Sequence, residues 1–245
     1  MLLYYYRQLK PEEKELYRQM DEAVGCCLPL LHQDGASSVE RLRAICRYVA
    51  LDHPEYFWFS GAFKCSGGDG GPRTLYFDYP APVREMDRVD GAIQAALREI
   101  GTDRYPQAES RARAVYDWML GNVRYDLAPD AAKDKLNQTI YSVFMERKSL
   151  CMGIAKAFQL LLRFCDVDGM IALGRLFGDE RFGHAWNMVR VEDAWLHVDA
   201  SVAYPCFQEM WEQRHGSKAP CFLVSDGFIR ATHRMTEPAQ SPSNF

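Results

Sequence analysis

Three side chains in the C-terminal half of the chain have the types that thiol acyl-transfer chemistry needs. Cys151 stands at the start of an apolar-periodic segment, His184 lies in Gly-His-Ala-Trp-Asn, and Asp199 lies in His-Val-Asp-Ala-Ser. In such chemistry a thiolate attacks a carbonyl carbon, a histidine moves the proton, and a carboxylate orients the histidine. The three residues are far apart in the chain, so the elements around them must bring them together.

The segment after Cys151 predicts a helix with one buried face. Cys151 would then lie at the helix N-terminus, where free backbone N–H groups and the positive end of the helix dipole favour a thiolate. Gly153 has no side chain and is expected to leave room for a substrate backbone. Taken alone, Cys151 also fits a small buried hydrophobe. The predicted buried positions are Ile154, Ala157, Phe158, Leu161 and Cys165.

Residues 184–191 and 194–199 predict two strands joined by a two-residue turn at Glu192-Asp193. With that turn, residue 186 lies opposite residue 199, and residue 184 lies opposite residue 201. Alternate side chains of a strand point to the same face, and a one-residue shift of the turn would separate them. The side chains predicted to share one face are His184, Trp186, Asp199 and Ser201.

His184 and Asp199 are therefore expected to be cross-strand neighbours, close enough for the carboxylate to accept an imidazole N–H. His197 falls on the same face and is a rival for the role of base. It ranks below His184 because it lies on the same strand as Asp199, two positions away.

The order of these motifs resembles the transglutaminase-like superfamily, a branch of the papain-like thiol enzymes, over about residues 105 to 205. Departures from the family pattern are Met152, Ile154 and Ser201, which bear on substrate preference more than on the three candidate catalytic residues. Segments 137–144 and 52–58 also resemble a bacterial subgroup of the family. The matching positions are Cys151, Gly153, Ala155, His184, Ala185, Trp186, Asn187, Trp195, Val198 and Asp199.

The resemblance implies an α+β fold, in which a helix opened by the cysteine packs on an antiparallel sheet. It also implies a Cys151, His184 and Asp199 triad acting on amide bonds of peptides or proteins, by hydrolysis or by transfer to an amine. Papain-like enzymes place an amide donor ahead of the cysteine, and Gln138 is the candidate for it; helix capping is its alternative role. Trp186 would wall the cleft or belong to the sheet core.

No metal or organic cofactor is required by this chemistry, and no acidic loop has a convincing calcium-binding spacing. The competing hypothesis is a protein- or ligand-binding module that keeps the fold without turnover. The sequence makes no prediction about oligomeric state.

Composition limits the other function classes. The chain has 245 residues, 48% hydrophobic and 25% charged, with a net charge of −4, which is typical of a globular protein. That charge argues against a generic nucleic-acid or anionic-membrane binder. No apolar run is long enough to span a bilayer, and the N-terminus does not resemble a signal peptide. The eight cysteines follow neither a zinc nor a disulfide pattern, so we expect a cytoplasmic protein with reduced thiols.

The chain is expected to have three parts: an N-terminal helical and β-hairpin region at 1–82, a catalytic domain at 83–236 and a loose tail at 237–245. In the first part, aromatic runs at 56–59 and 74–79 predict two strands joined by a glycine-rich connection. Gly101 should end a long helix that begins near Met86. A last strand is expected at 221–224.

Overall fold

The computed structural model describes residues 2–34, 37–68, 71–81, 83–128, 130–176, 179–219 and 221–238. The chain divides into two compact units, residues 2–84 and the residues from 85 onward. Of the tail expected at 237–245, residues 239–245 lie outside the described part, and Glu237 ends the last strand. Within the described residues, no helix has both the length and the apolar character needed to cross a bilayer.

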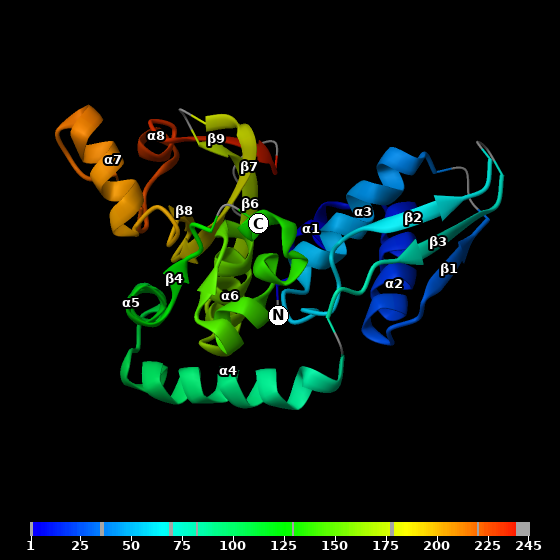
Figure 1. The fold of residues 1–245 in the computed structure, drawn as a ribbon, viewed down its shortest axis with the longest axis horizontal. Coiled ribbons are helices and arrows are strands. Elements are labelled where there is room, and N and C mark those ends of the chain that lie inside the picture. Colours follow the sequence, from blue (N-terminus) through cyan, green and yellow to red (C-terminus); the bar gives the residue numbers. More distant parts are fainter. Residues whose placement is uncertain are drawn as a thin grey trace. The chain divides into compact units, whose positions relative to one another are not determined.

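The unit formed by residues 2–84 combines three helices with a three-stranded antiparallel sheet of order β1-β3-β2 (Figure 1). Helix α2 begins with Pro11 and has acidic residues in its first turn, which suits the positive end of a helix. Its buried face packs against α3. The elements are α1 (Tyr4–Gln8), α2 (Pro11–Gly25), β1 (Leu30–Gln33), α3 (Val39–Asp52), β2 (Phe63–Ser66) and β3 (Arg73–Phe77).

The strand predicted at 56–59 was wrong. These residues form turns in which Phe59 N–H bonds the carbonyl of Tyr56, and Trp58 donates its indole N–H to the carbonyl of Val24. Tight turns after α3 let successive aromatic rings pack inward, whereas a strand would send alternate rings to solvent. β3 pairs with β2, which follows residues 56–59 in the chain, so a hairpin does form with the glycine-rich segment between its strands.

The second unit has a four-stranded antiparallel sheet of order β8-β7-β6-β9, against which α6 packs through β6 and β7 (Figure 1). This mixed arrangement is the expected α+β fold. Helix α4 ends at Gly101, whose φ of 60° suits glycine. The elements are η1 (Val83–Glu85), α4 (Met86–Ile100), η2 (Thr102–Arg104), α5 (Ala108–Asn122), β4 (Arg124–Tyr125), η3 (Ala131–Lys133), η4 (Lys135–Gln138), η5 (Ser142–Glu146), β5 (Lys148–Ser149), α6 (Cys151–Phe164), β6 (Gly169–Leu176), β7 (Asp179–Val191), β8 (Ala194–Val198), α7 (Pro205–His215), α8 (Asp226–Ile229) and β9 (His233–Glu237).

The predicted pairing of β7 with β8 is confirmed. Asn187 lies opposite Val198, and Val191 lies opposite Ala194, which puts the two-residue turn at the predicted place. Glu192 has a φ of 53°, the left-handed conformation that tight hairpin turns require. This register directs the side chains of residues 184 and 199 to the same face of the sheet.

Helix α6 begins at Cys151, as predicted. The expected role of Gly153 is wrong, because this residue faces the protein interior. A Cβ atom on Gly153 would lie 2.1 Å from Oγ of Ser149 and 2.8 Å from the carbonyl oxygen of Thr139. The glycine therefore allows α6 to pack closely on the segment that precedes it.

The last strand is β9, and the strand predicted at 221–224 is absent from that described segment, where Val224 forms only an isolated bridge with His197. β9 pairs antiparallel with β6, with His233 opposite Leu176. This pairing places β9 at the edge of the sheet, next to β6. It adds a histidine to the site that the sequence analysis did not consider.

Candidate active site

A pocket of about 390 Å³ lies at the N-terminus of α6. Cys151 and His184 both line it, so the thiol and the imidazole face the same space. Among the described residues that line the pocket, none is Asp, Glu, Lys or Arg. The lining consists of Tyr125, Ala132, Gln138, Leu150, Cys151, Leu176, Gly183, His184 and Phe207.

The thiol of Cys151 is partly exposed and hydrogen-bonded to the imidazole of His184. The backbone N–H of Ala185 also donates to the sulfur. Burial alone would raise the pKa of Cys151, but the hydrogen bond and the charge of His184 outweigh it and lower the pKa below its ordinary value. The sulfur therefore has the electrostatic surroundings that favour a thiolate.

His184 connects the thiol to a buried carboxylate. Its Nε2 lies 2.6 Å from Oδ2 of Asp199, which leaves Nδ1 as the ring nitrogen available to Cys151. Burial opposes a charge on the imidazole, but Asp199 and Cys151 together raise the pKa of His184 to about 10. His184 is consequently an imidazolium at neutral pH, the state that pairs with a thiolate.

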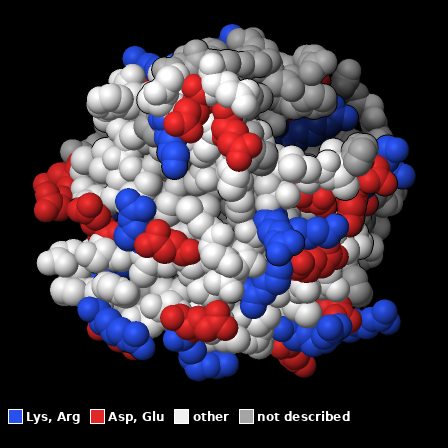
Figure 2. Space-filling model, turned by 60° about the vertical axis from the view of Figure 1, so that its left-hand side comes forward, with Lys and Arg blue, Asp and Glu red and all other residues white. Residues whose placement is uncertain are grey.

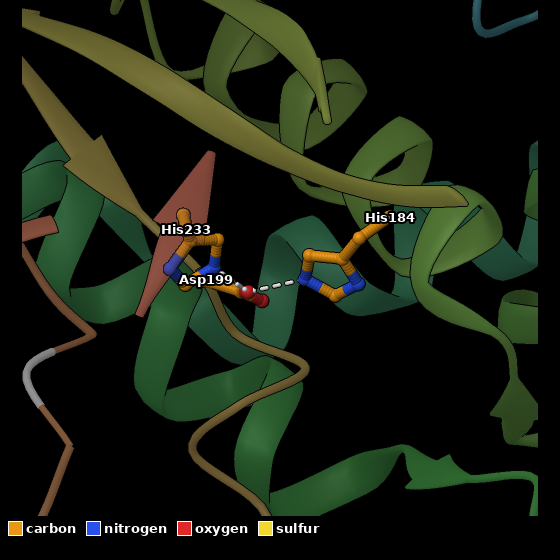
Figure 3. Close-up of side chains that lie close together, drawn as sticks. All are labelled: His184, Asp199 and His233. Carbon is orange, nitrogen blue, oxygen red and sulfur yellow. Dashed lines mark hydrogen bonds and ion pairs between the residues drawn. The ribbon is translucent and has the colours of Figure 1, made fainter. Parts of the chain in front are cut away.

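Asp199 is 1% exposed and is held at both oxygens. Oδ1 accepts the backbone N–H and the hydroxyl of Ser201, at 2.8 and 2.6 Å, and the N–H of Val202 at 3.2 Å. Oδ2 accepts from His184 and, at 2.8 Å, from Nε2 of His233 (Figure 3). Burial alone would raise the pKa of Asp199, but the imidazoles hold it far below its usual range.

The residues that the sequence analysis missed include His233. Its segment, Thr-His-Arg-Met-Thr-Glu, is almost entirely polar, so periodicity gave little sign of a strand. One ligand-type atom from each of His184, Asp199 and His233 lies within 4.8 Å of the others. The nitrogen-to-oxygen distances of 2.6 and 2.8 Å suit hydrogen bonds, because tetrahedral zinc would hold its ligands roughly 3.3 Å apart.

Trp186 and His197 lie beneath the site instead of in it. Trp186 is 1% exposed, is absent from the pocket lining, and packs nearly parallel to His184 with 5.9 Å between ring centres. Its indole N–H donates to Nδ1 of His197, whose Nε2 lies 2.8 Å from Asp226. Of its two expected roles, Trp186 therefore has the core one, and His197 is directed away from Cys151.

Comparison with known proteins bears on the same part of the chain. Residues 94–200 match the family model described as the transglutaminase-like superfamily. The chain contains a transglutaminase-like domain. All three candidate catalytic residues lie within the matched segment.

Two curated relatives are similar to part of the chain. Kyphoscoliosis peptidase of Mus musculus is 27% identical over 202 residues, which cover 71% of this chain and 30% of that protein. Kyphoscoliosis peptidase of Homo sapiens is 28% identical over 133 residues, covering 50% and 19%. The chain thus spans less than a third of the length of these relatives. A solved structure described as a TGase has a TM-score of 0.43 and 11% identity, covering 70% of this chain and 50% of that one.

Two further polar side chains of the transglutaminase-like domain line the same pocket as Cys151. Gln138 ends η4 and lines the pocket, and the neighbouring Asn137 anchors that turn by donating to Asp126 and to the carbonyl of Ala131. The hydroxyl of Tyr125 hydrogen-bonds both the sulfur and the backbone N–H of Cys151. Tyr125 was not predicted; β4 places it by pairing with β5, directly before the cysteine.

Charges elsewhere on the surface are mixed. On the face drawn in Figure 2, basic and acidic side chains lie close to one another, with uncharged surface between them. Among the described residues, Lys148 pairs with Asp126 at 3.2 Å.

Proposed function

We propose that this protein is a thiol enzyme that cleaves amide bonds of peptides or proteins through a covalent thioester. The observation that carries the proposal is the hydrogen-bonded row of Cys151, His184 and Asp199, with its first two members lining one pocket. The transglutaminase-like domain supports it, as does the name peptidase borne by the two relatives.

In the first half of the reaction, the thiolate of Cys151 attacks the amide carbonyl carbon. A carbon–sulfur bond forms and the carbonyl π electrons move to oxygen. The imidazolium of His184 then gives its proton to the leaving nitrogen as the carbon–nitrogen bond breaks. Asp199 stabilises the imidazolium before this transfer and keeps the ring oriented.

The negative oxygen of the tetrahedral intermediate needs hydrogen-bond donors. The backbone N–H of Cys151, at the N-terminus of α6, and the side-chain amide of Gln138 are the candidates. In the resting site the hydroxyl of Tyr125 occupies that N–H. A substrate carbonyl would therefore take the place of the Tyr125 hydroxyl when it binds.

In the second half, neutral His184 takes a proton from the acceptor, which attacks the thioester and releases Cys151. Water as acceptor gives a hydrolase, and a primary amine gives an acyl transferase. The two outcomes differ only in which acceptor reaches the thioester, so product analysis decides between them. Mass spectrometry of products from a peptide library, with and without added primary amine, makes that measurement.

The pocket suits an uncharged acyl side chain. Leu150, Leu176 and Phe207 supply apolar surface, and apart from the His184 and Cys151 pair the described lining has no charged side chain to pair with a substrate charge. In the peptide library we therefore expect apolar residues to be enriched beside the cleaved bond over charged ones.

Labelling with a thiol-directed electrophile tests the proposal. Cys151 should react at least 10-fold faster than the other seven cysteines, because its thiolate is stabilised at neutral pH. His184→Ala should abolish this difference. Equal labelling of all eight cysteines in the parent would instead favour a binding module that has kept the fold.

Gln138→Ala tests the oxyanion assignment separately. Losing one oxyanion donor should reduce turnover by ~10²-fold or more while leaving the labelling rate of Cys151 unchanged, since alkylation forms no oxyanion. Near-full turnover would remove Gln138 from the mechanism and leave it a structural residue of η4.

A further inference from the structure

One oxygen of Asp199 is shared between two imidazoles. Nε2 of His184 lies 2.6 Å from Oδ2, and Nε2 of His233 lies 2.8 Å from the same atom (Figure 3). Asp199 is an anion at working pH, because its pKa is far below the usual range. A carboxylate only accepts hydrogen bonds, so each imidazole must present an Nε2–H to it.

The other side of His233 is also held in place. Nδ1 of His233 lies 2.6 Å from Oγ1 of Thr232, whose hydroxyl donates to the carbonyl of Ile229 at 3.0 Å, and the ring is 2% exposed. Burial lowers the pKa of His233, which favours a neutral ring. Because the anionic Oδ2 of Asp199 can only accept a hydrogen bond, the proton of that ring lies on Nε2.

We propose that His233 is a positioning residue of the candidate site: its Nε2–H holds Oδ2 of Asp199 between two imidazoles and limits how tightly Asp199 retains the proton of His184. This inference rests on the proposed function, in which His184 must hold a proton in the resting site and release it to the leaving nitrogen.

Competition for one acceptor atom explains the effect. Each donor on an anionic oxygen withdraws electron density, so removing one strengthens the bond to the donor that remains. Without the His233 donor, Asp199 would bind the His184 imidazolium more strongly, and proton release from His184 would become harder. With it, Asp199 orients His184 without retaining its proton too tightly for catalysis.

The surroundings leave few other groups to produce this effect. Among the described residues, the titratable neighbours of His184 are Asp199, Cys151 and His233, with the Tyr125 hydroxyl beyond the sulfur. His233 faces Asp199 and His184, its ring centre lying 5.4 Å from that of His184. On its other side the ring of Trp186 lies 4.8 Å away, followed by the pair formed by His197 and Asp226, and His197 interacts electrostatically with His233.

The test compares two substitutions of His233 in the full chain. His233→Gln keeps an N–H that can reach Asp199, and His233→Leu removes the donor while filling much of the space. Both are combined with Cys151→Ser, so that NMR titration of the His184 ring reports the histidine alone. We expect the titration midpoint to rise by about one pH unit in His233→Leu and by less than about 0.3 in His233→Gln.

An unchanged or lowered midpoint in a folded His233→Leu would overturn the proposal, as would equal shifts in the two variants. If His233→Leu does not fold, the nitrogen chemical shifts of His233 in the parent decide: an unprotonated Nε2 would refute the inference, and a protonated Nε2 supports it. Labelling of Cys151 in the parent is scored separately. Slow labelling would contradict the proposed function, whereas the titration midpoint of His184 would still show whether His233 has the proposed role.

Discussion

The two units each contain a fully buried aspartate, and the two carboxylates have opposite electrostatic character. Asp52, in the unit of residues 2–84, accepts the backbone N–H groups of Tyr5 and Tyr6 at 3.1 and 2.8 Å and the hydroxyl of Tyr17 at 3.0 Å. Asp199 accepts comparable neutral donors at one oxygen and two imidazoles at the other. Their exposed fractions are 0% and 1%.

Burial raises the pKa of Asp52 to about 6, because its backbone and tyrosine donors offset only part of the desolvation cost. The pKa of Asp199 is instead far below the usual range, since the imidazolium of His184 outweighs the same cost. The number of hydrogen bonds therefore does not distinguish a structural carboxylate from a functional one. What distinguishes the functional carboxylate is a partner that can carry a charge and exchange a proton.

Asp52 illustrates the structural case. As the last residue of α3, it accepts from the first turn of α1 and so fixes that helix on its neighbour. Free N–H groups at a helix start need such an acceptor. Asp199 uses Ser201 and Val202 in the same structural way, and adds a connection to the thiol through His184.

The largest expected effect comes from replacing each aspartate by asparagine and measuring the labelling rate of Cys151. In Asp199→Asn, the three donors on Oδ1 force the amide NH₂ group toward His184. Two donors would then face each other, so His184 must turn its unprotonated nitrogen to the amide and lose its imidazolium state. We expect labelling to slow by about 10²-fold or more.

Asp52→Asn is the matched control. Its donors Tyr5, Tyr6 and Tyr17 belong to the unit of residues 2–84 and are not part of the candidate site, so in folded protein Cys151 should be labelled at a rate within about twofold of the parent. Circular dichroism establishes that both variants are folded at the assay temperature. Comparable slowing in the two variants would show that buried acids act on Cys151 only through general stability.

The pH dependence of unfolding should differ in sign between the two sites. The folded pKa of Asp52 is raised, so its contribution to stability is present below about pH 4 and is lost as the pH rises through 6, at a cost of about 3 kcal/mol. The folded pKa of Asp199 is lowered, so its contribution is present above about pH 4 and is lost as the pH falls. Urea denaturation of the parent and of each asparagine variant measures both differences.

Subtracting Asp52→Asn from the parent isolates the Asp52 carboxylate, because asparagine does not titrate. This difference should decrease from pH 4 to 7, whereas the contribution of the Asp199 carboxylate is complete above about pH 4 and should be nearly constant over that range. A difference for Asp52 that is constant or increases from pH 4 to 7 would contradict the assignment of Asp52 as the acid with the raised pKa.

Local sequence patterns predicted the part of the site that depends on short-range rules. The turn at Glu192-Asp193 set the register of β7 and β8, and with it the shared face of His184 and Asp199. The apolar period after Cys151 set the start of α6. Both predictions needed only the geometry of one hairpin and one helix.

The missed features depend on contacts between distant segments. His233 reaches Asp199 because β9 pairs with β6, and a polar strand at a sheet edge has no clear periodic signal. Tyr125 reaches Cys151 because β4 pairs in parallel with β5. Gly153 was assigned to substrate binding, but its neighbours are Ser149 and Thr139, which only the packing of α6 reveals.

The smallest expected effects come from removing one hydroxyl donor at each aspartate. Tyr17→Phe deletes the donor 3.0 Å from Oδ2 of Asp52, and Ser201→Ala deletes the donor 2.6 Å from Oδ1 of Asp199. Each should cost about 1–2 kcal/mol of unfolding free energy at neutral pH. Without the hydroxyl the pKa of Asp52 rises further, so the cost of Tyr17→Phe should be smaller at pH 4, where the carboxyl is already protonated in the folded state.

Ser201→Ala should behave differently because His184 still holds the pKa of Asp199 far below the range measured. Its cost should therefore be the same at pH 5.5 and pH 8, and labelling of Cys151 should stay within about threefold of the parent. A cost that depends on pH as strongly as that of Tyr17→Phe would mean that the serine hydroxyl, and not the imidazolium, keeps Asp199 ionised. A hydroxyl donor would then set the ionisation of both buried carboxylates. The imidazolium of His184 would no longer be what distinguishes Asp199 from Asp52.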